Sequence, residues 1–481
     1  MYIGIDIGTS GVKGVLLNEN GDELFQCRNE YEYSLEDGRA EQEPDEVFDA
    51  FIQTVHSVFS ASPSTPLALG LSAAMHSVFP VDAQGIPLTK AVLWMDVRSE
   101  PQVEQVIRKK EEVNLWNATG TPVHPMTPLY KIMWFKENNP EIYQKAFKWV
   151  SIKEYIVFRL TGEWRIDYSM ASASGLFNPR ELQWNTQALQ LCGIGAENLS
   201  ELTNPLTQIK VHHPLFPEKT AWFLGSTDGC MANIGSGGIG EEDLIVTIGS
   251  SAAIRAITKN FSPKEKALFS YMIIPGEFIT GGASNYGATI IDWAKNNLFE
   301  GIHDFQNLEE KINQSVPGAE GLIFLPYLFG ERAPLWDANA KSEFCFQKNT
   351  HSKEDMLRAS LEGMLFNIRC IMDRVESITE KKKNILVNGG VSNSAIAMQI
   401  FSDMLSREIK VMNEVDSSSL GAGLLAMRAF NRSNSWFKKN VHFVVYQPNK
   451  KNERIYSESY KKFLEILEEK YFKDKLIRVI N

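Results

Sequence analysis

Two short turns rich in glycine and hydroxyl residues could bind phosphate. The first, Gly8-Thr9-Ser10, follows the β-type run at residues 2–7 and precedes a second such run that contains Lys13. The other, Gly249-Ser250-Ser251, also lies between two β-type runs. Glycine lets backbone N–H groups approach an anion, hydroxyl groups add donors, and a lysine adds charge. Each turn alone also fits a hairpin without a ligand, whereas two together could hold a polyphosphate from both sides.

Two carboxylates could take part in the transfer of a phosphoryl group. Asp6 ends the first β-type run, where it could hold Mg²⁺ directly or through water beside bound phosphates. Asp228 follows the apolar run at residues 221–225 and could accept a proton from a substrate hydroxyl that attacks phosphorus. Two other interpretations stay open: Asp6 could only brace a turn, and Asp228 could be a helix N-cap.

Three further segments could reach the same site. Gly389-Gly390-Val391-Ser392-Asn393 joins a strand-like run to a probable helix, so a base or phosphate could approach its backbone, although it also fits a plain connection. Met75-His76 follows an apolar strand, and the segment at residues 94–98 follows another, so both could line one cleft at strand ends. None of the eight histidines forms a His-x-x-x-His pair, and we expect no zinc site.

The two turns lie about half a chain apart, which favours an internal duplication, with chance similarity as the alternative. Strand and helix patterns alternate in both halves, and one amphipathic helix is expected at residues 44–59. We therefore predict an α/β protein of two domains, residues 1–243 and 244–481. The first domain would carry the first phosphate turn and the possible base Asp228, and the second would carry the second phosphate turn.

Composition excludes several classes of protein. The chain has 481 residues, of which 43% are hydrophobic and 22% charged, so it is neither fibrous nor disordered and has room for two to four domains. The net charge of −10 disfavours nucleic acid and anionic membranes as partners. Five scattered cysteines predict reduced thiols, and no long apolar run or export signal is present, so we expect a cytoplasmic protein. The oligomeric state stays open, with a homodimer as one option.

These motifs together resemble the FGGY carbohydrate kinases over nearly the whole chain. Further similar stretches are LPYLFGERAP at residues 325–334 and LGAG at residues 420–423. The resemblance implies two actin-like, ribonuclease H-like domains with a cleft between them, the first for sugar binding and the second for ATP binding. It also implies transfer of the γ-phosphoryl group of ATP, with Mg²⁺, to a sugar or polyol.

The same resemblance implies a role for each matching residue. Asp228 would be the catalytic base, Asp6 would lie near Mg²⁺, and Met75 and His76 would contact the sugar. The nucleotide would be held by Gly8, Thr9, Ser10, Lys13, Gly249, Ser250, Gly287, Gly389, Gly390 and Asn393. The chain departs from the usual pattern at Ser250, where Thr is common, at Val391, where a third Gly is common, and at Ser402, where Ala is usual.

Within the family, the gluconate kinase branch is the most similar. The supporting stretches are residues 40–46, 72–77, 120–126, 152–156 and 167–173, and Gly229 stands where Asn often follows the base. D-Gluconate is therefore the expected acceptor. Its carboxylate needs a cation or donors, for which Arg98, Lys153, His76 and His124 are candidates. The alternatives are a xylulokinase or another FGGY polyol or ketose kinase and, from a different class, an actin-like ATP-driven conformational protein.

Overall fold

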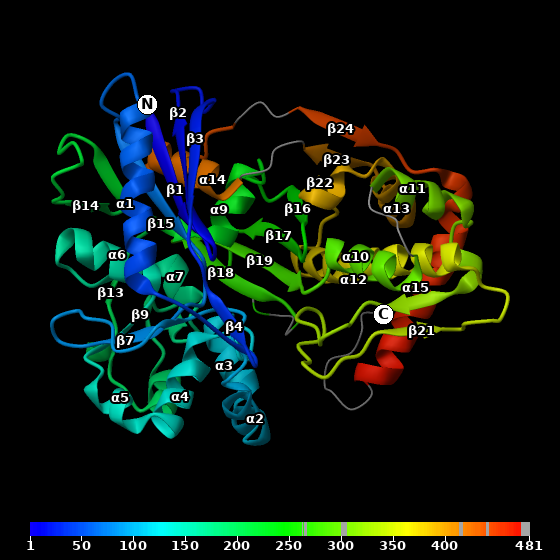
Figure 1. Cartoon of the computed structure of the whole chain (residues 1–481), viewed down its shortest axis with the longest axis horizontal. Helices are drawn as coiled ribbons and strands as arrows, with labels where there is room; N and C mark the ends of the chain where they lie inside the picture. Colours follow the sequence, from blue (N-terminus) through cyan, green and yellow to red (C-terminus); the bar gives the residue numbers. More distant parts are fainter. Residues whose placement is uncertain (262, 264–266, 300–304, 413–416, 439–441, 473–481) are drawn as a thin grey trace.

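The computed structural model describes residues 1–261, 263, 267–299, 305–412, 417–438 and 442–472, and its elements form two sheets with helices around them (Figure 1). The first sheet has the order β14-β15-β6-β1-β2-β3 and the second β18-β19-β17-β16-β22-β23-β24. The strands of the first sheet are β1 (Tyr2–Ile7), β2 (Gly11–Leu17), β3 (Glu23–Glu30), β6 (Ala68–Ala73), β14 (Gln208–Ile209) and β15 (Ala221–Thr227). Those of the second are β16 (Asp243–Ile248), β17 (Ala252–Thr258), β18 (Phe269–Ile274), β19 (Glu277–Ser284), β22 (Asn384–Asn388), β23 (Ile409–Met412) and β24 (Phe443–Tyr446).

The two sheets repeat one topology. In the first, β1 pairs antiparallel with β2 and parallel with β6, and β6 pairs parallel with β15. In the second, β16 pairs antiparallel with β17 and parallel with β22, and β22 pairs parallel with β23. The turn between β1 and β2 therefore corresponds to the turn between β16 and β17. This repeat confirms the duplication that the two turns predict.

Helix α1 (Pro44–Ala61) covers one face of the first sheet and illustrates why local sequence predicts its element. Pro44 occupies the first helical turn together with two acidic residues, an arrangement that suits a helix N-terminus. Val47, Phe51, Val55 and Val58 recur at helical spacing and are fully buried. The helix predicted at residues 44–59 is confirmed.

Helix α14 (Ser417–Phe430) belongs to the second half of the chain but packs on the first sheet, against β1, β6 and α9 (Asp228–Gly235). In Figure 1, α14 and α9 lie between the two sheets. The approach is backbone to backbone: a Cβ on Gly4 would lie 1.9 Å from the Ser419 carbonyl oxygen, and one on Gly421 would lie 2.0 Å from that of Met231. Glycine is required at both positions, and through them the two halves are joined.

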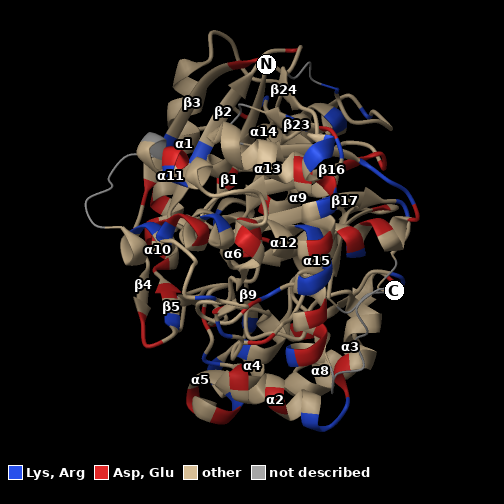
Figure 2. Ribbon diagram, turned by 90° about the vertical axis from the view of Figure 1, so that its right-hand side faces the viewer, with Lys and Arg blue, Asp and Glu red and all other residues tan. Residues whose placement is uncertain are grey.

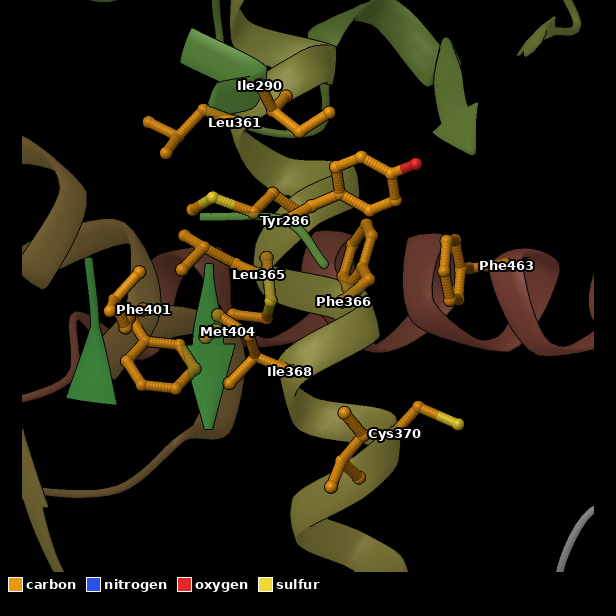
Figure 3. Close-up of a cluster of buried hydrophobic side chains, with 14 of the residues drawn as sticks. Tyr286, Ile290, Leu361, Leu365, Phe366, Ile368, Cys370, Phe401, Met404 and Phe463 are labelled. Carbon is orange, nitrogen blue, oxygen red and sulfur yellow. The ribbon is translucent and has the colours of Figure 1, made fainter. Parts of the chain in front are cut away.

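The second half has its own apolar core (Figure 3). Leu365 and Phe366 of α12 (Lys353–Thr379) meet Phe401 of α13 (Ala395–Leu405) and Phe463 of α15 (Glu453–Leu467). Ile290 of α10 (Ala288–Leu298) packs into the same cluster. Of these helices, α12 packs directly against β17 and β19 of the second sheet.

The remaining elements are short or lie at the periphery. The helices are α2 (Glu100–Arg108), α3 (Glu112–Thr119), α4 (Pro128–Asn138), α5 (Pro140–Lys145), α6 (Ile152–Thr161), α7 (Tyr168–Ser172), α8 (Thr186–Cys192) and α11 (Phe305–Gln314). The strands are β4 (Ser34–Glu36), β5 (Arg39–Gln42), β7 (Phe79–Val81), β8 (Ala91–Val92), β9 (Lys148–Val150), β10 (Arg165–Asp167), β11 (Phe177–Asn178), β12 (Gln183–Trp184), β13 (Glu201–Thr203), β20 (Ile323–Leu325) and β21 (Glu343–Cys345).

Charges of both signs are interspersed over outer helices such as α2 and α15 (Figure 2). All five cysteines are free thiols. Among the described residues, no helix combines the length and apolar character that a membrane crossing requires.

Candidate active site

A cavity of about 330 Å³ lies between the two halves of the molecule. From the first half it is lined by Thr9, Met75, His76 and Asp228, and from the second by Ser251, Arg255, Tyr271, Arg332 and Ser418. A larger cavity, of about 430 Å³, lies between α12 and α15 and contains none of the predicted site residues. The smaller cavity is therefore the candidate active site.

The first phosphate turn opens onto this cavity. The Gly8 backbone N–H donates to the Gly11 carbonyl at 3.0 Å and closes the turn, and the Trp94 indole N–H donates to the Thr9 hydroxyl at 3.2 Å. Lys13 lies directly opposite Asp6 in the β1–β2 register, so both side chains share one face of the sheet. The structure thus brings the predicted lysine and carboxylate together beside the turn.

Backbone contacts from Gly287 and Gly389 hold the second turn in place. The Gly287 N–H donates to the Ser250 carbonyl at 2.8 Å, and a Cβ on Gly287 would lie 2.2 Å from the Gly249 carbonyl oxygen. Gly389, with a φ of 97°, approaches Ile248 just before this turn, and a Cβ there would lie 2.6 Å from the Ile248 carbonyl oxygen. Open space faces Gly390, and Asn393 is exposed. Gly287 and Gly389 therefore gather around the Gly249 turn, and Gly390 and Asn393 follow in the short 3-10 helix Gly390–Asn393.

A β-bulge directs the strand that carries Asp228. The register between β15 and β6 shifts between Phe223 and Ser226, and Gly225 lies between them with a φ of 79°. Thr227 is the N-cap of α9, since its hydroxyl accepts from the Cys230 N–H at 3.4 Å. The N-cap interpretation of Asp228 is therefore wrong, because Asp228 is the first helical residue.

The Asp228 carboxylate lines the cavity and is surrounded by protein on its other sides. Burial raises the pKa of Asp228, while the Gly229 N–H, which donates to its Oδ1 at 2.7 Å, and the charge of Arg255 oppose that rise. A raised pKa makes the ionised carboxylate a stronger base than an exposed aspartate.

Lys153 does not line the cavity; it lies beside the end of β15, the strand that precedes Asp228. Its Nζ donates to Asp167 Oδ2 at 2.8 Å and to the Ser226 carbonyl at 3.0 Å, and both charged side chains are at most 2% exposed. Asp167 also caps α7 through the Met170 N–H. This buried pair fixes the end of β15 and so positions the residues that follow it.

The two candidate histidines are neutral hydrogen-bonding groups. The His76 Nδ1 donates to the Ala173 carbonyl at 2.8 Å, which leaves Nε2 as an acceptor. The His124 Nδ1 accepts from the Met126 N–H at 3.2 Å, which leaves Nε2–H as a donor. Burial lowers the pKa of each histidine to about 3. Both can bond to hydroxyl groups, but neither carries a charge at neutral pH.

His76 also has a φ of 69°, an uncommon conformation for a residue other than glycine. The buried Lys131 holds it, because its Nζ donates to the His76 carbonyl at 2.7 Å. A strained residue held by its surroundings at a cavity wall is typical of functional sites.

Of the arginines, Arg98 is engaged elsewhere, while two that sequence reasoning did not single out line the cavity. Arg98 forms ion pairs with Glu41 at 2.5 Å and Asp96 at 2.8 Å. Arg332 donates to the Asn285 side chain at 2.8 Å and lies 5.2 Å from the centre of the Trp94 ring. Arg255 interrupts the apolar strand β17, and this lone charge in a buried run was the signal that could have identified it.

The donor set suits a metal ion that is bound mainly through phosphate. The described residues contain no group of three or more His, Cys, Asp or Glu side chains that could hold a metal. Asp6, buried and accepting from the Ser72 hydroxyl at 2.7 Å, is a single carboxylate beside the first turn. Mg²⁺ commonly binds to one or two carboxylates, with phosphates and water as its other ligands, so Asp6 fits this ion.

Comparison with known proteins identifies the family. Residues 1–227 match the N-terminal domain of the FGGY family of carbohydrate kinases, and residues 244–430 match its C-terminal domain. The chain belongs to this family. It is therefore a carbohydrate kinase, and the predicted architecture of two actin-like domains is confirmed.

Three relatives illustrate the similarity. The chain is 36% identical over 459 residues to a gluconokinase of Bacillus subtilis (strain 168), covering 90% of this chain and 88% of that one. It is 29% identical over 477 residues to a xylulose kinase of Lactococcus lactis, covering 95% and 94%. The crystal structure of a gluconate kinase from Lactobacillus acidophilus superposes with a TM-score of 0.93 at 30% identity, covering 98% and 99%.

Replacing Lys153 by Met tests whether this lysine positions the site or binds substrate. The change leaves Asp167 charged and buried without its partner, so the free energy of unfolding should fall by about 3 to 5 kcal/mol. Urea denaturation measures this fall. The double variant Lys153→Met/Asp167→Asn should recover part of it, and Lys109→Met, at an exposed lysine, should match the wild type. Unchanged stability with a raised KM for the acceptor would instead show that Lys153 binds substrate.

Proposed function

We propose that this FGGY kinase transfers the γ-phosphoryl group of ATP to the terminal hydroxyl of D-gluconate, giving 6-phospho-D-gluconate and ADP. The observation that carries the proposal is a small cavity with a half-buried carboxylate, Asp228, and two arginines, Arg255 and Arg332, on its walls. A neutral sugar offers no charge to these cations, whereas a sugar acid does. The similarity to gluconokinases of two Bacillus species supports the same choice.

Asp228 is the proposed base. It accepts the proton of the C6 hydroxyl as that oxygen attacks the γ-phosphorus, and the bond to the β-phosphate oxygen breaks to release ADP. His76 Nε2 is an acceptor for another hydroxyl of the substrate, and Met75 packs beside it in the same wall. These side chains orient the acceptor so that its terminal oxygen faces the phosphate turns.

The two turns are the proposed phosphate sites. The proposed donors are the backbone N–H and hydroxyl groups of Thr9 and Ser10 in the first half and of Ser250 in the second. The N–H groups of Gly8 and Gly249 close the turns, because they donate to the Gly11 and Ser251 carbonyls. Lys13 adds a positive charge beside the first turn, and Gly390 leaves space for the nucleoside. Asp6 would hold Mg²⁺, which neutralises phosphate charge when it is bound.

A panel of acceptors in a coupled ADP assay tests the substrate. We expect D-gluconate to exceed D-xylulose, D-ribulose, glycerol and D-glucose in kcat/KM by about 10-fold or more, because a neutral acceptor offers Arg255 no anionic partner. A higher value for D-xylulose would make the enzyme a xylulokinase, the alternative that the Lactococcus relative supports. ADP release without any acceptor would favour an ATP-driven conformational protein.

Asp228→Asn tests the base. We expect kcat to fall by about 10²- to 10⁴-fold with little change in KM, because the amide cannot accept the proton. In the wild type, kcat/KM should fall as the pH drops through the raised pKa of Asp228, so this fall occurs at a higher pH than for an ordinary aspartate. The matched control is Asp292→Asn, which removes an exposed carboxylate. Near-normal turnover by Asp228→Asn would exclude the assignment.

A further inference from the structure

Arg255 has an unsatisfied donor at the wall of the cavity. Its Nη1 is buried and has no hydrogen-bond partner among the residues that the structure describes. Arginine stays charged in proteins, and burying one of its donors without a hydrogen-bond partner is unfavourable. Other buried atoms in the described part of the chain also lack a partner, but Arg255 lines the candidate active site, where a ligand can reach this donor.

The surroundings of Arg255 contain too little negative charge to satisfy it. Asp228 is the charged group that favours its protonated form, and Asp228 is the proposed base; burial raises the pKa of the Cys230 thiol, which therefore stays neutral. Arg332 faces the same cavity; burial and the charge of Arg255 lower its pKa, while the charge of Glu331 opposes this fall. Two guanidinium groups that repel each other across one cavity favour an anion between them.

Gly229 provides the space that Arg255 occupies. A Cβ at this position would lie 2.8 Å from Met75 Cε and 3.5 Å from Arg255 Nε. A longer side chain there would displace the thioether, the guanidinium or both. The glycine that follows the base therefore allows a cation to lie in the acceptor site.

We propose that Arg255 binds the carboxylate of an acyclic sugar acid and thereby makes the enzyme prefer that acid to a neutral polyol. This inference rests on the proposed function and assigns its specificity to one residue. A guanidinium matches a carboxylate with two parallel hydrogen bonds, so Nη1 gains the partner that it lacks in the protein. Arg332, on the same cavity, is the second cation that stabilises the bound anion.

The test compares Arg255→Met with the wild type on D-gluconate and on D-gluconamide, which has nearly the same shape but no charge. With gluconate, kcat/KM should fall by about 100-fold, mainly through KM, whereas with gluconamide it should change by less than about 3-fold. Arg255→Lys should restore part of the activity toward gluconate. An equal loss on both acceptors would overturn the inference, because Arg255 would then act on the transferred phosphoryl group. No loss on gluconate would also overturn it.

A binding measurement without ATP separates recognition from chemistry. Gluconate should raise the Tm of the wild type and of Arg108→Met, an exposed arginine on α2, but not that of Arg255→Met. A second variant, Gly229→Asn, should weaken binding in the same way by crowding Met75 and Arg255. Equal stabilisation of the wild type and Arg255→Met by gluconate would overturn the inference.

Failure of the proposed function has a different signature. If the wild type phosphorylates a different sugar acid, D-gluconate is the wrong acceptor. The inference then stands when Arg255→Met loses activity toward that acid but keeps its activity toward the corresponding amide. If the wild type accepts only neutral sugars, both the proposed function and the inference fail.

Discussion

The close contact between α14 and the first sheet sets the geometry of the whole cleft. Gly4 on β1 and Gly421 on α14 have no Cβ atom. A Cβ at either position would lie only 1.9 to 2.0 Å from a backbone carbonyl oxygen of the facing element. Because α14 comes from the second half of the chain, this contact joins the halves. Its Ser418 lines the cavity, and its partner α9 begins with Asp228. The same backbone contact therefore positions the proposed base relative to the walls of both halves.

The cleft carries positively charged groups although the protein as a whole is negatively charged. The protein carries a net charge of −10, yet ATP and a sugar acid are both anions. Backbone N–H groups at the two turns and the guanidinium groups of Arg255 and Arg332 supply positive potential where it is needed. His76 and His124 stay neutral, since burial lowers the pKa of each to about 3. Because the cavity is partly shielded from bulk water, these few cations act more strongly than surface charges do.

Local sequence predicted the elements of the fold well because their signals are local. Each hairpin is two β-forming runs around a glycine-rich turn, and α1 is a proline followed by apolar residues at helical spacing. The two-domain architecture followed from the repeat and the resemblance. Thr227 shows the limit of this reasoning: the N-cap of α9 lies one residue before Asp228, and only the hydrogen bond to Cys230 reveals it.

The cations of the cavity could not be predicted in the same way. Arg98 and Lys153 look available in the sequence, but Glu41 and Asp167, distant along the chain, pair with them. Arg255 lies in a strand that reads as buried core, and Arg332 lies in a loop held by Asn285. Which charge stays without a partner depends on tertiary contacts, and sequence spacing does not contain them.

The most direct test of this account is a crystal structure of the enzyme with D-gluconate, Mg²⁺ and a non-hydrolysable ATP analogue. We expect gluconate in the cavity between the two phosphate turns, its C6 oxygen about 2.6 to 3.2 Å from the Asp228 carboxylate and its own carboxylate on Arg255. Gluconate bound outside this cavity, or with its carboxylate away from Arg255 and its terminal hydroxyl away from Asp228, would contradict the account.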